Sequence, residues 1–299
     1  MTQFATLISA ISPCKLEEPL HKHTSFKVGG PAEIFALPGT INELLDIIST
    51  CNKHSVPLTI IGGGSNMLIA DTGLRGVVVN LKHLNQMSHH GDGKLEAQAG
   101  VNLKNFAVFA YKHGYTGLEF ASGIPGTLGG AIYMNAGAYG SEVGDVCTHV
   151  TVYDGTVRTI SKHDMHFGYR NSIVQGTGAI VLSATFQMPY GGETSQFEIK
   201  MKMRELNTKR RISQPLQYPS AGSTFKRPLG HFAGKLIEDA GLKGHSIGGA
   251  MVSTKHAGFI VNTGSATAKD IYDLIQDVRQ RVHMQFDVML EPEVKILGF

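Results

Sequence analysis

The chain has 299 residues, 42% of them apolar and 17% charged, which is the balance of a globular protein large enough for two or three packed domains. A net charge of +3 gives no indication of nucleic-acid binding, and the absence of an apolar run of about 18 residues argues against a transmembrane helix. No signal-peptide pattern is seen, so we expect a cytoplasmic protein.

Cysteine and histidine form no recognisable metal or disulfide pattern. The three cysteines, Cys14, Cys51 and Cys147, are scattered and make no CxxC pair. The 14 histidines match no known ligand spacing. We therefore expect neither a disulfide framework nor a catalytic metal.

Hydrophobic patterning predicts an α+β protein with more than one domain. Helical periodicity or charged helical runs predict helices at 41–55, 101–115, 197–211, 232–240 and 267–286. Short β-branched runs predict strands at 57–61, 76–81, 179–188, 258–262 and 288–297. Between 149 and 161, two alternating runs joined by Asp154-Gly155 predict a hairpin.

The first glycine-rich stretch is Gly62-Gly63-Gly64, directly after an apolar run. It lacks the G-x-G-x-x-G spacing and following helix of a Rossmann turn, and no Lys-Ser/Thr completes a P-loop. A second turn at Asp71 to Gly73 predicts strand–turn–strand instead. The glycines are either a nest of backbone N–H groups for a pyrophosphate or a tight turn that needs positive φ.

A second stretch, residues 121–145, is also rich in glycine and alanine around the short apolar segment 131–136. Small residues let a backbone approach a large flat ligand closely, although they also serve close packing. The turn at 123–126 offers further N–H groups. Two such stretches favour one long cofactor held along its length.

Seven segments, in order, resemble landmarks of the UDP-N-acetylenolpyruvoylglucosamine reductase family. They are TSFKVGGPAE (24–33), IGGGSNMLI (61–69), SGIPGTLGGAIYMNAGAYG (122–140), GYRNS (168–172), AGSTFKRP (221–228), KHAGFIVN (255–262) and LEPEVKILG (290–298). The resemblance covers essentially the whole chain. The segment between Arg170 and Ser223 is too short for the tyrosine-bearing insertion of some relatives, so the chain resembles the family's shorter class.

This resemblance implies a fold and an activity. The fold is a vanillyl-alcohol-oxidase (PCMH-type) FAD-binding domain of two α+β subdomains, 1–80 and 81–205, followed by an α+β substrate-binding domain, 206–299. The last strand, near 288–297, is expected to return to the FAD side. Non-covalent FAD, reduced by NADPH, would reduce UDP-N-acetylglucosamine enolpyruvate to UDP-N-acetylmuramate for peptidoglycan. Beyond this UDP-sugar and NADPH, no nucleic acid, membrane or obligate protein partner is expected.

The resemblance also assigns catalytic roles. Hydride addition at C3 leaves negative charge on C2 and the carboxylate, which needs fixed positive charge and then a proton. Arg170 would hold the carboxylate, Ser223 would donate the proton to C2, and Glu293 would help to stabilise the intermediate. By residue type alone, Arg170 would more often form a surface or interdomain salt bridge, and Ser223 would usually be a turn residue. The alternative for Glu293 is a solvated strand edge. Glu291, two positions before Glu293, would share its face of a strand.

Binding residues follow from the same resemblance. The expected FAD contacts are Ile61, Gly62, Gly63, Gly64, Ser65, Asn66, Ser122, Gly123, Ile124, Pro125, Gly126, Asn135, Ala136, Gly137 and Ala138. The expected substrate contacts are Tyr169, Arg211 and Arg227. Arg211 ends a basic run, 209–211, that suits a diphosphate but also a solvated helix end or a weak nucleic-acid patch. Arg227 stands where longer relatives have asparagine.

Two other functions are weighed against the reductase. One is an FAD-dependent oxidase of the same fold that uses oxygen. Such oxidases often attach their flavin covalently through a His or Cys of a loop. Neither glycine-rich stretch contains Cys or His, which argues against a covalently attached flavin. The other is a nucleotide-binding protein without catalysis, which would keep its function when Ser223 is replaced.

Overall fold

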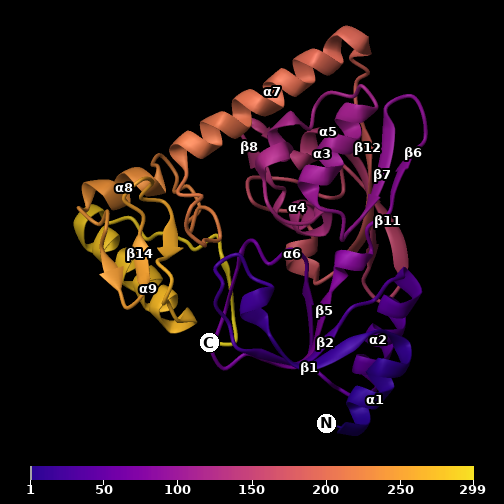
Figure 1. The fold of residues 1–299 in the computed structure, drawn as a ribbon, viewed down its shortest axis with the longest axis horizontal. Helices are drawn as coiled ribbons and strands as arrows, with labels where there is room; N and C mark the ends of the chain where they lie inside the picture. The colour runs from indigo at the N-terminus through magenta and orange to yellow at the C-terminus, as the bar shows by residue number, and fades with distance from the viewer. Residues whose placement is uncertain (1) are drawn as a thin grey trace. The chain divides into compact units, whose positions relative to one another are not determined.

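The computed structural model describes residues 2–299, without the side chains of residues 2 and 192–195. It contains two compact units. Unit 1 consists of the chain up to residue 14 with residues 36–63 and 79–210, and unit 2 consists of residues 15–35, 64–78 and 211–299. Each unit is therefore assembled from segments far apart in the sequence (Figure 1). The expected division at 1–80, 81–205 and 206–299 stays a prediction.

Unit 1 is built on an antiparallel sheet with strand order β11-β10-β12-β7-β6. Its strands are β6 (Met87–His89), β7 (Lys94–Gln98), β10 (Cys147–Tyr153), β11 (Val157–Ser161) and β12 (Ile180–Gln187). The predicted hairpin is confirmed, because β10 and β11 pair with Tyr153 opposite Val157. Alternate residues such as Val150 and Val152 are fully buried, as expected for a sheet with one covered face.

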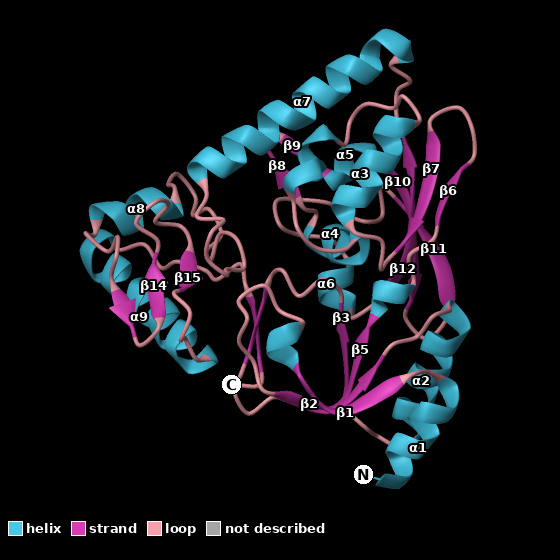
Figure 2. Ribbon diagram, in the orientation of Figure 1, coloured by secondary structure: helices cyan, strands magenta, loops and turns pink. Residues whose placement is uncertain are grey.

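Helices α3, α4 and α5 lie on one face of this sheet (Figure 2). The helices of unit 1 are α1 (Thr2–Ile11), α2 (Ile41–Lys53), α3 (Leu103–Lys112), α4 (Leu128–Met134), α5 (Val143–Val146), α6 (Val174–Thr177) and α7 (Gly192–Ser213), whose last three residues belong to unit 2. Phe106 of α3 packs on Phe186 of β12 with 4.8 Å between ring centroids. The shorter elements are β3 (Leu58–Ile61), η2 (Leu81–His83), η3 (Glu119–Gly123), β8 (Gly137–Ala138) and β9 (Ser141–Glu142).

Unit 2 contains several small sheets and two helices. Strands β1 (Cys14–Pro19), β2 (Pro31–Ala36) and β5 (Leu74–Asn80) are neighbours in that order, with η1 (Leu20–Lys22) after β1. Strands β4 (Met67–Ile69) and β16 (Lys295–Leu297) pair in parallel. A third sheet has the order β13 (Ser246–Ile247), β14 (Ala250–Val252) and β15 (Ile260–Asn262), and the helices are α8 (Ala233–Asp239) and α9 (Ala268–Phe286).

Helix α9 organises the core of unit 2. Its buried face, which includes Ile271 and Leu274, packs with Phe26 and Leu68 from the N-terminal part of the chain. The carboxylate of Asp71 accepts hydrogen bonds from the first two N–H groups of α9, at 2.9 and 3.0 Å. An acidic group at this position complements the helix dipole. The predicted turn at Asp71 therefore fixes the start of a helix almost 200 residues later in the chain.

One expected strand was wrong in its extent, and one glycine-rich stretch has more regular structure than its composition indicates. The strand expected at 288–297 is regular only over Lys295–Leu297, because Pro292 has no N–H to donate and forms only an isolated bridge with Phe225. The small-residue stretch 121–145 is not a loop throughout, since it contains helix α4. The strand–turn–strand prediction after Gly64 is confirmed: β4 begins at Met67 and β5 at Leu74.

Candidate active site

The two glycine-rich stretches meet within unit 1. A Cβ atom at Gly63 would lie 2.9 Å from the Cα atom of Gly126, and one at Gly62 would overlap the Thr127 hydroxyl. Of the three consecutive glycines, only Gly64 has positive φ, at 59°. Gly63 is thus required for close approach to the backbone of Gly126, and Gly62 leaves room for the Thr127 side chain. Neither glycine is required for an unusual turn.

The contact between the two glycine-rich stretches bears on whether this part of the chain can accommodate FAD. A dinucleotide with a central diphosphate needs backbone N–H groups from more than one turn along its length, without side chains in the way. The contact between Gly63 and Gly126 places two such turns together, with bare backbone where these two glycines meet. The arrangement fits the cofactor expected from the sequence.

Helix α7 packs against the second glycine-rich stretch. The Asn207 amide donates to the Ser122 hydroxyl at 2.9 Å, and Ser122 donates to the Glu119 carbonyl at 2.8 Å. The side chain of Arg210 lies 3.2 Å from the position of a Cβ at Gly123, and burial lowers its pKa although a guanidinium stays protonated at neutral pH. Sequence reasoning gave Asn207 no site role and considered Arg210 only as a member of the basic run 209–211. Their spacing on one helix face was the available signal.

Asn135 ends helix α4 in the left-handed conformation, with φ 42°. It is fully buried, its amide donates to the Gly168 carbonyl at 3.0 Å, and its side-chain oxygen accepts from the N–H of Gly144 at 2.9 Å. No surface of Asn135 is left for FAD. We therefore assign it a positioning role in place of the expected direct contact. The other FAD contacts expected from the sequence stay predictions.

Arg170 lies at the tip of a tight turn that Asn135 holds. Gly168 and Asn171 exchange two backbone hydrogen bonds, which leaves Tyr169 and Arg170 as the turn residues, with Arg170 at φ 53°. The guanidinium donates to the carbonyl of Gly137 at 3.2 Å and lies 5.2 Å from the centroid of the Tyr169 ring. Arg170 thus contacts a residue that was expected at the FAD site.

In unit 2, the segments that carry Ser223 and Glu293 run side by side. The N–H of Glu293 donates to the carbonyl of Thr224 at 2.8 Å. Ser223 is exposed, whereas its neighbour Thr224 is fully buried and anchors the loop. The tertiary fold therefore brings together two of the three expected catalytic residues, which are 70 positions apart.

Asn66 joins the first glycine-rich loop to the same segment. Its side-chain amide donates to the carbonyl of Glu293 at 3.0 Å, and its own carbonyl accepts from the N–H of Lys295. Glu291 forms an ion pair with Lys226, so its carboxylate contacts the loop that follows Ser223. Burial and the charge of Lys226 lower the pKa of Lys295, while Glu291 and Glu293 oppose this shift.

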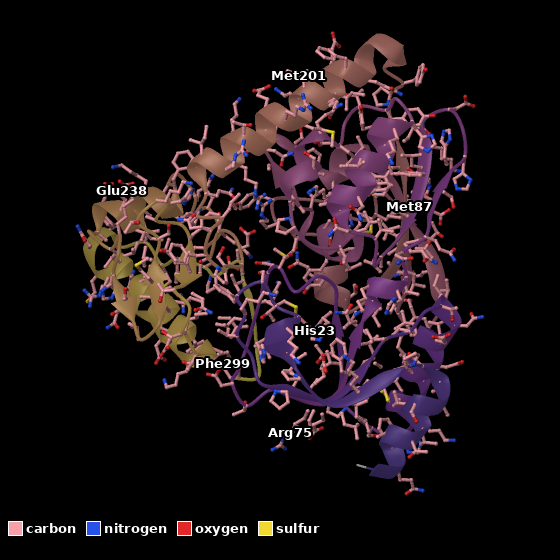
Figure 3. The ribbon with its side chains drawn as sticks, in the orientation of Figure 1. His23, Arg75, Met87, Met201, Glu238 and Phe299 are labelled. Carbon is pink, nitrogen blue, oxygen red and sulfur yellow. The ribbon has the colours of Figure 1, made fainter. Side chains whose placement is uncertain are left out.

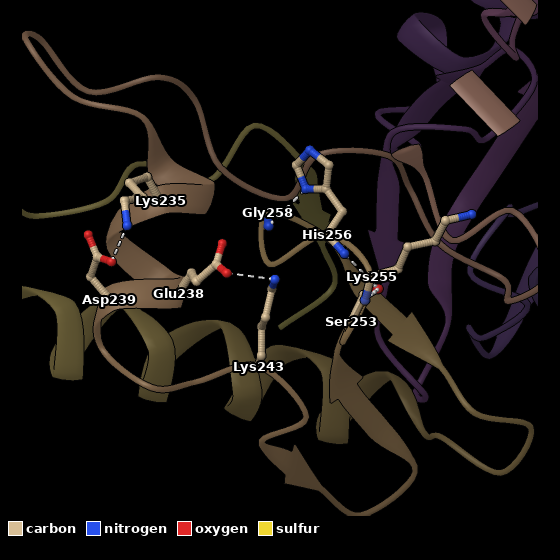
Figure 4. A network of polar contacts seen from close by, with 8 residues as sticks. All are labelled: Lys235, Glu238, Asp239, Lys243, Ser253, Lys255, His256 and Gly258. Carbon is tan, nitrogen blue, oxygen red and sulfur yellow. Dashed lines mark hydrogen bonds and ion pairs between the residues drawn. The ribbon is translucent and has the colours of Figure 1, made fainter. Parts of the chain in front are cut away.

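The segment KHAGFIVN (255–262) also contacts the loop that carries Ser223. Figure 4 shows its residues Lys255, His256 and Gly258. The carbonyl of Gly258 accepts from the N–H of Thr224 at 2.8 Å, and His256 Nδ1 accepts from the N–H of Gly258 at 3.1 Å. Burial lowers the pKa of His256, which keeps its ring neutral and able to accept this bond. The Lys255 ammonium donates to the carbonyl of Arg211 at 2.8 Å.

The expected substrate residues have defined surroundings. Arg211 lies in the last turn of α7, where Lys255 binds its carbonyl. Arg227 stacks on Phe232, with 4.6 Å between the guanidinium carbon and the ring centroid. The basic run 209–211 is split, because Lys209 pairs with Glu205 on α7 whereas Arg210 turns to Gly123. The substrate role of Arg211 and Arg227 stays a prediction.

Within residues 2–299, no group of three or more His, Cys, Asp or Glu side chains is placed to hold a metal ion. The described helices include none long and apolar enough to cross a membrane. All three cysteines are free thiols.

Comparison with known proteins gives a consistent result along the chain. The model of the UDP-N-acetylenolpyruvoylglucosamine reductase C-terminal domain matches residues 214–297, and that of an FAD binding domain matches residues 32–161. A UDP-N-acetylenolpyruvoylglucosamine reductase of Caldanaerobacter subterraneus subsp. tengcongensis is 52% identical over 285 residues, 95% of this chain and 93% of that protein. One of Lachnoclostridium phytofermentans is 50% identical over 287 residues, 94% of this chain and 92% of that protein.

A solved structure agrees with these relatives. The UDP-N-acetylenolpyruvylglucosamine reductase from Thermus caldophilus has a TM-score of 0.81 to this chain, with 32% sequence identity, and the match covers 96% of this chain and 99% of that one. The chain therefore belongs to the UDP-N-acetylenolpyruvoylglucosamine reductase family.

Proposed function

We propose that Arg170, Ser223 and Glu293 carry out the chemistry of this family in the present chain. As a family member, the chain is an FAD-dependent oxidoreductase that uses NADPH to reduce UDP-N-acetylglucosamine enolpyruvate to UDP-N-acetylmuramate in peptidoglycan precursor synthesis. The observation that carries the residue assignment is the backbone bond between Glu293 and Thr224, which sets Glu293 beside the Ser223 loop.

The roles follow from where charge develops. Bound FAD, once reduced by NADPH, would supply a hydride to C3 of the enolpyruvyl double bond, and the π electrons would pass to C2 and the adjacent carboxylate. A guanidinium at Arg170 would bind that carboxylate through two N–H groups and would remain charged throughout. The hydroxyl of Ser223 would then give its proton to C2. Glu293 would orient the polar groups around this intermediate.

The turn that carries Arg170 supports this assignment. A side chain at the tip of a hairpin fixed by two backbone hydrogen bonds loses little entropy when it binds a substrate. Its contact with Gly137 keeps the guanidinium at the second glycine-rich stretch. We expect the carboxylate of the substrate to replace part of that contact when it binds.

The reaction also indicates where the protein works. Both NADPH and the UDP-sugar are cytoplasmic metabolites, so we place the chain in the cytoplasm. The expectation that it needs no nucleic acid, membrane or obligate protein partner stays a prediction. Tyr169, Arg211 and Arg227 are proposed to bind the UDP-sugar.

An anaerobic spectroscopic experiment tests the proposal. The flavin spectrum of the purified protein should bleach with NADPH and return only when the enolpyruvyl sugar is added. In Ser223→Ala, bleaching should persist while the return slows by about 10²–10⁴-fold, because only the second half-reaction needs the proton donor. Ser246→Ala, at another exposed serine of unit 2, is the matched control and should behave as the wild type.

Other outcomes point to the other functions. Reoxidation by oxygen but not by the enolpyruvyl sugar would identify an oxidase. Binding of FAD and UDP-sugar without any turnover would identify a nucleotide-binding protein. An unchanged second half-reaction in Ser223→Ala would remove Ser223 as proton donor and leave the family activity intact.

A further inference from the structure

The turn that carries Arg170 continues into a segment whose side chains bind the end of helix α4. Ser172 Oγ donates to the carbonyl of Tyr133 at 2.8 Å, and the amide of Gln175 donates to the same carbonyl at 2.7 Å. Tyr133 lies in the last turn of α4, where backbone carbonyls have no partner inside the helix. Two side chains therefore anchor the segment after Arg170 to the second glycine-rich stretch.

Gln175 also binds Arg170 itself. Its amide nitrogen lies 2.9 Å from the carbonyl oxygen of Arg170, so its two N–H groups serve two carbonyls, one on each segment. Gln175 belongs to the short helix α6, which lies next to α4 (Figure 2). This one side chain thus ties the peptide group that follows Arg170 to the end of α4.

The backbone of Arg170 needs such support. Its φ of 53° is in the left-handed region, at the second central position of a four-residue turn, where glycine or asparagine is usual. An arginine in this conformation costs free energy and persists only when the surrounding contacts hold it. The carbonyl that Gln175 binds belongs to this strained residue.

We propose that Gln175 is a positioning residue for the reduction, because it fixes the backbone of Arg170 and thereby directs the guanidinium toward the carboxylate of the substrate. This role depends on the function proposed above for Arg170. The ordinary alternative is that Gln175 only caps α4 and stabilises the fold. Ser172 already binds the carbonyl of Tyr133, so loss of the Gln175 amide leaves that helix end capped and affects chiefly Arg170.

Two substitutions of Gln175 test this role. Gln175→Met removes both N–H donors and keeps a side chain of similar length. The return of the flavin spectrum with the enolpyruvyl sugar, measured in a single anaerobic turnover, should slow about tenfold or more. Bleaching by NADPH should be unchanged, since Arg170 acts on the carboxylate of the sugar. Gln175→Lys keeps N–H donors at nearly the same reach and should recover most of the rate.

Gln187→Met is the matched control. The amide of Gln187 also donates to a backbone carbonyl, that of Asp92 in the turn between β6 and β7, at 2.5 Å. Gln187 lies in β12, in the sheet that also contains Met87, which is labelled in Figure 3. This variant should keep the wild-type rate. A rate loss in Gln175→Met no larger than that in Gln187→Met would overturn the proposal, and so would an equally slow Gln175→Lys.

A double-mutant cycle separates positioning from a general structural effect. If Gln175 acts through Arg170, adding Gln175→Met to Arg170→Ala should slow the return of the spectrum by less than about twofold, because the guanidinium is already gone. The same fold loss in both backgrounds would overturn the proposal and leave the function of Arg170 intact. A wild-type rate in Arg170→Ala alone would instead remove Arg170 from the proposed function, and the role of Gln175 with it.

Discussion

The side-chain amide of Asn66 donates a hydrogen bond of 3.0 Å to the carbonyl of Glu293, although 227 positions separate the two residues. Asn66 closes the first glycine-rich loop, and Glu293 is an expected catalytic residue. The bond lies beside the parallel pairing of β4 with β16, which fixes the register of both segments. One side chain therefore links the expected FAD loop to the backbone of the expected catalytic residue Glu293 within unit 2.

Replacement of Asn66 tests this link. In Asn66→Ala we expect a loss of about 1 kcal/mol in the free energy of unfolding and a slower return of the flavin spectrum, about tenfold or more, because Glu293 is less well positioned. Asn66→Asp should not restore the rate, since a carboxylate cannot donate to a carbonyl. Single-turnover kinetics with the enolpyruvyl sugar give the measurement. Asn52→Ala, at an exposed asparagine of α2, is the control, and equal rates in the two alanine variants would contradict the prediction.

Asn135 is expected to matter more for stability than for flavin contact. Asn135→Ala leaves the buried N–H of Gly144 without its side-chain acceptor, removes one of the two hydrogen bonds to the Gly168 carbonyl, and places alanine at positive φ. The free energy of unfolding in urea should fall by about 2–4 kcal/mol. Asn135→Gly should recover only the part of this loss that comes from placing alanine at positive φ, because glycine adopts that conformation without strain. Asn171→Ala, in the neighbouring turn, has an exposed side chain and should change stability little. A fully stable Asn135→Ala would show that these bonds are not needed.

The pair Glu18 and His23 makes stability depend on acid pH. The hydrogen bond from His23 and the nearby charge of Lys15 hold the pKa of Glu18 below its ordinary value of about 4.5. A carboxyl group whose pKa is lower in the folded state stabilises the fold above its unfolded pKa, and this stabilisation is lost as pH falls through the folded value. The melting temperature of the wild type should therefore fall more steeply below about pH 4.5 than that of Glu18→Gln. The carboxyl groups of proteins titrate in roughly the range of pH 3 to 6. Curves of melting temperature against pH that run parallel for the two proteins over this range would refute the assignment.

The cysteines should differ sharply in reactivity. Burial raises the pKa of Cys51 to about 11 and that of Cys147 to about 12, so neither forms an accessible thiolate near neutral pH. Cys14 is only half-buried, although burial raises its pKa as well. Titration with an aromatic disulfide at pH 8 should modify Cys14 slowly in the native protein and all three thiols in urea. Rapid modification of Cys51 or Cys147 in the native state would contradict their burial.

Local sequence patterns were enough for most elements. The helices α2 and α9 follow from apolar residues at helical spacing, and the hairpin β10–β11 follows from Asp154-Gly155 between alternating runs. These features depend on contacts between near neighbours, which the sequence lists directly. The strand expected at 288–297 failed because the pattern ignored the lack of an N–H at Pro292.

The resemblance of seven segments, in order, to landmarks of a known family also indicated the family and implied the cofactor, which the two glycine-rich stretches favoured independently. What only the tertiary structure decided is which of these residues touch. The approach of Gly63 to Gly126 and the bond from Asn207 to Ser122 have no local signature. The reason is physical: they arise where long-range packing brings distant backbones together and buried polar groups must find partners there.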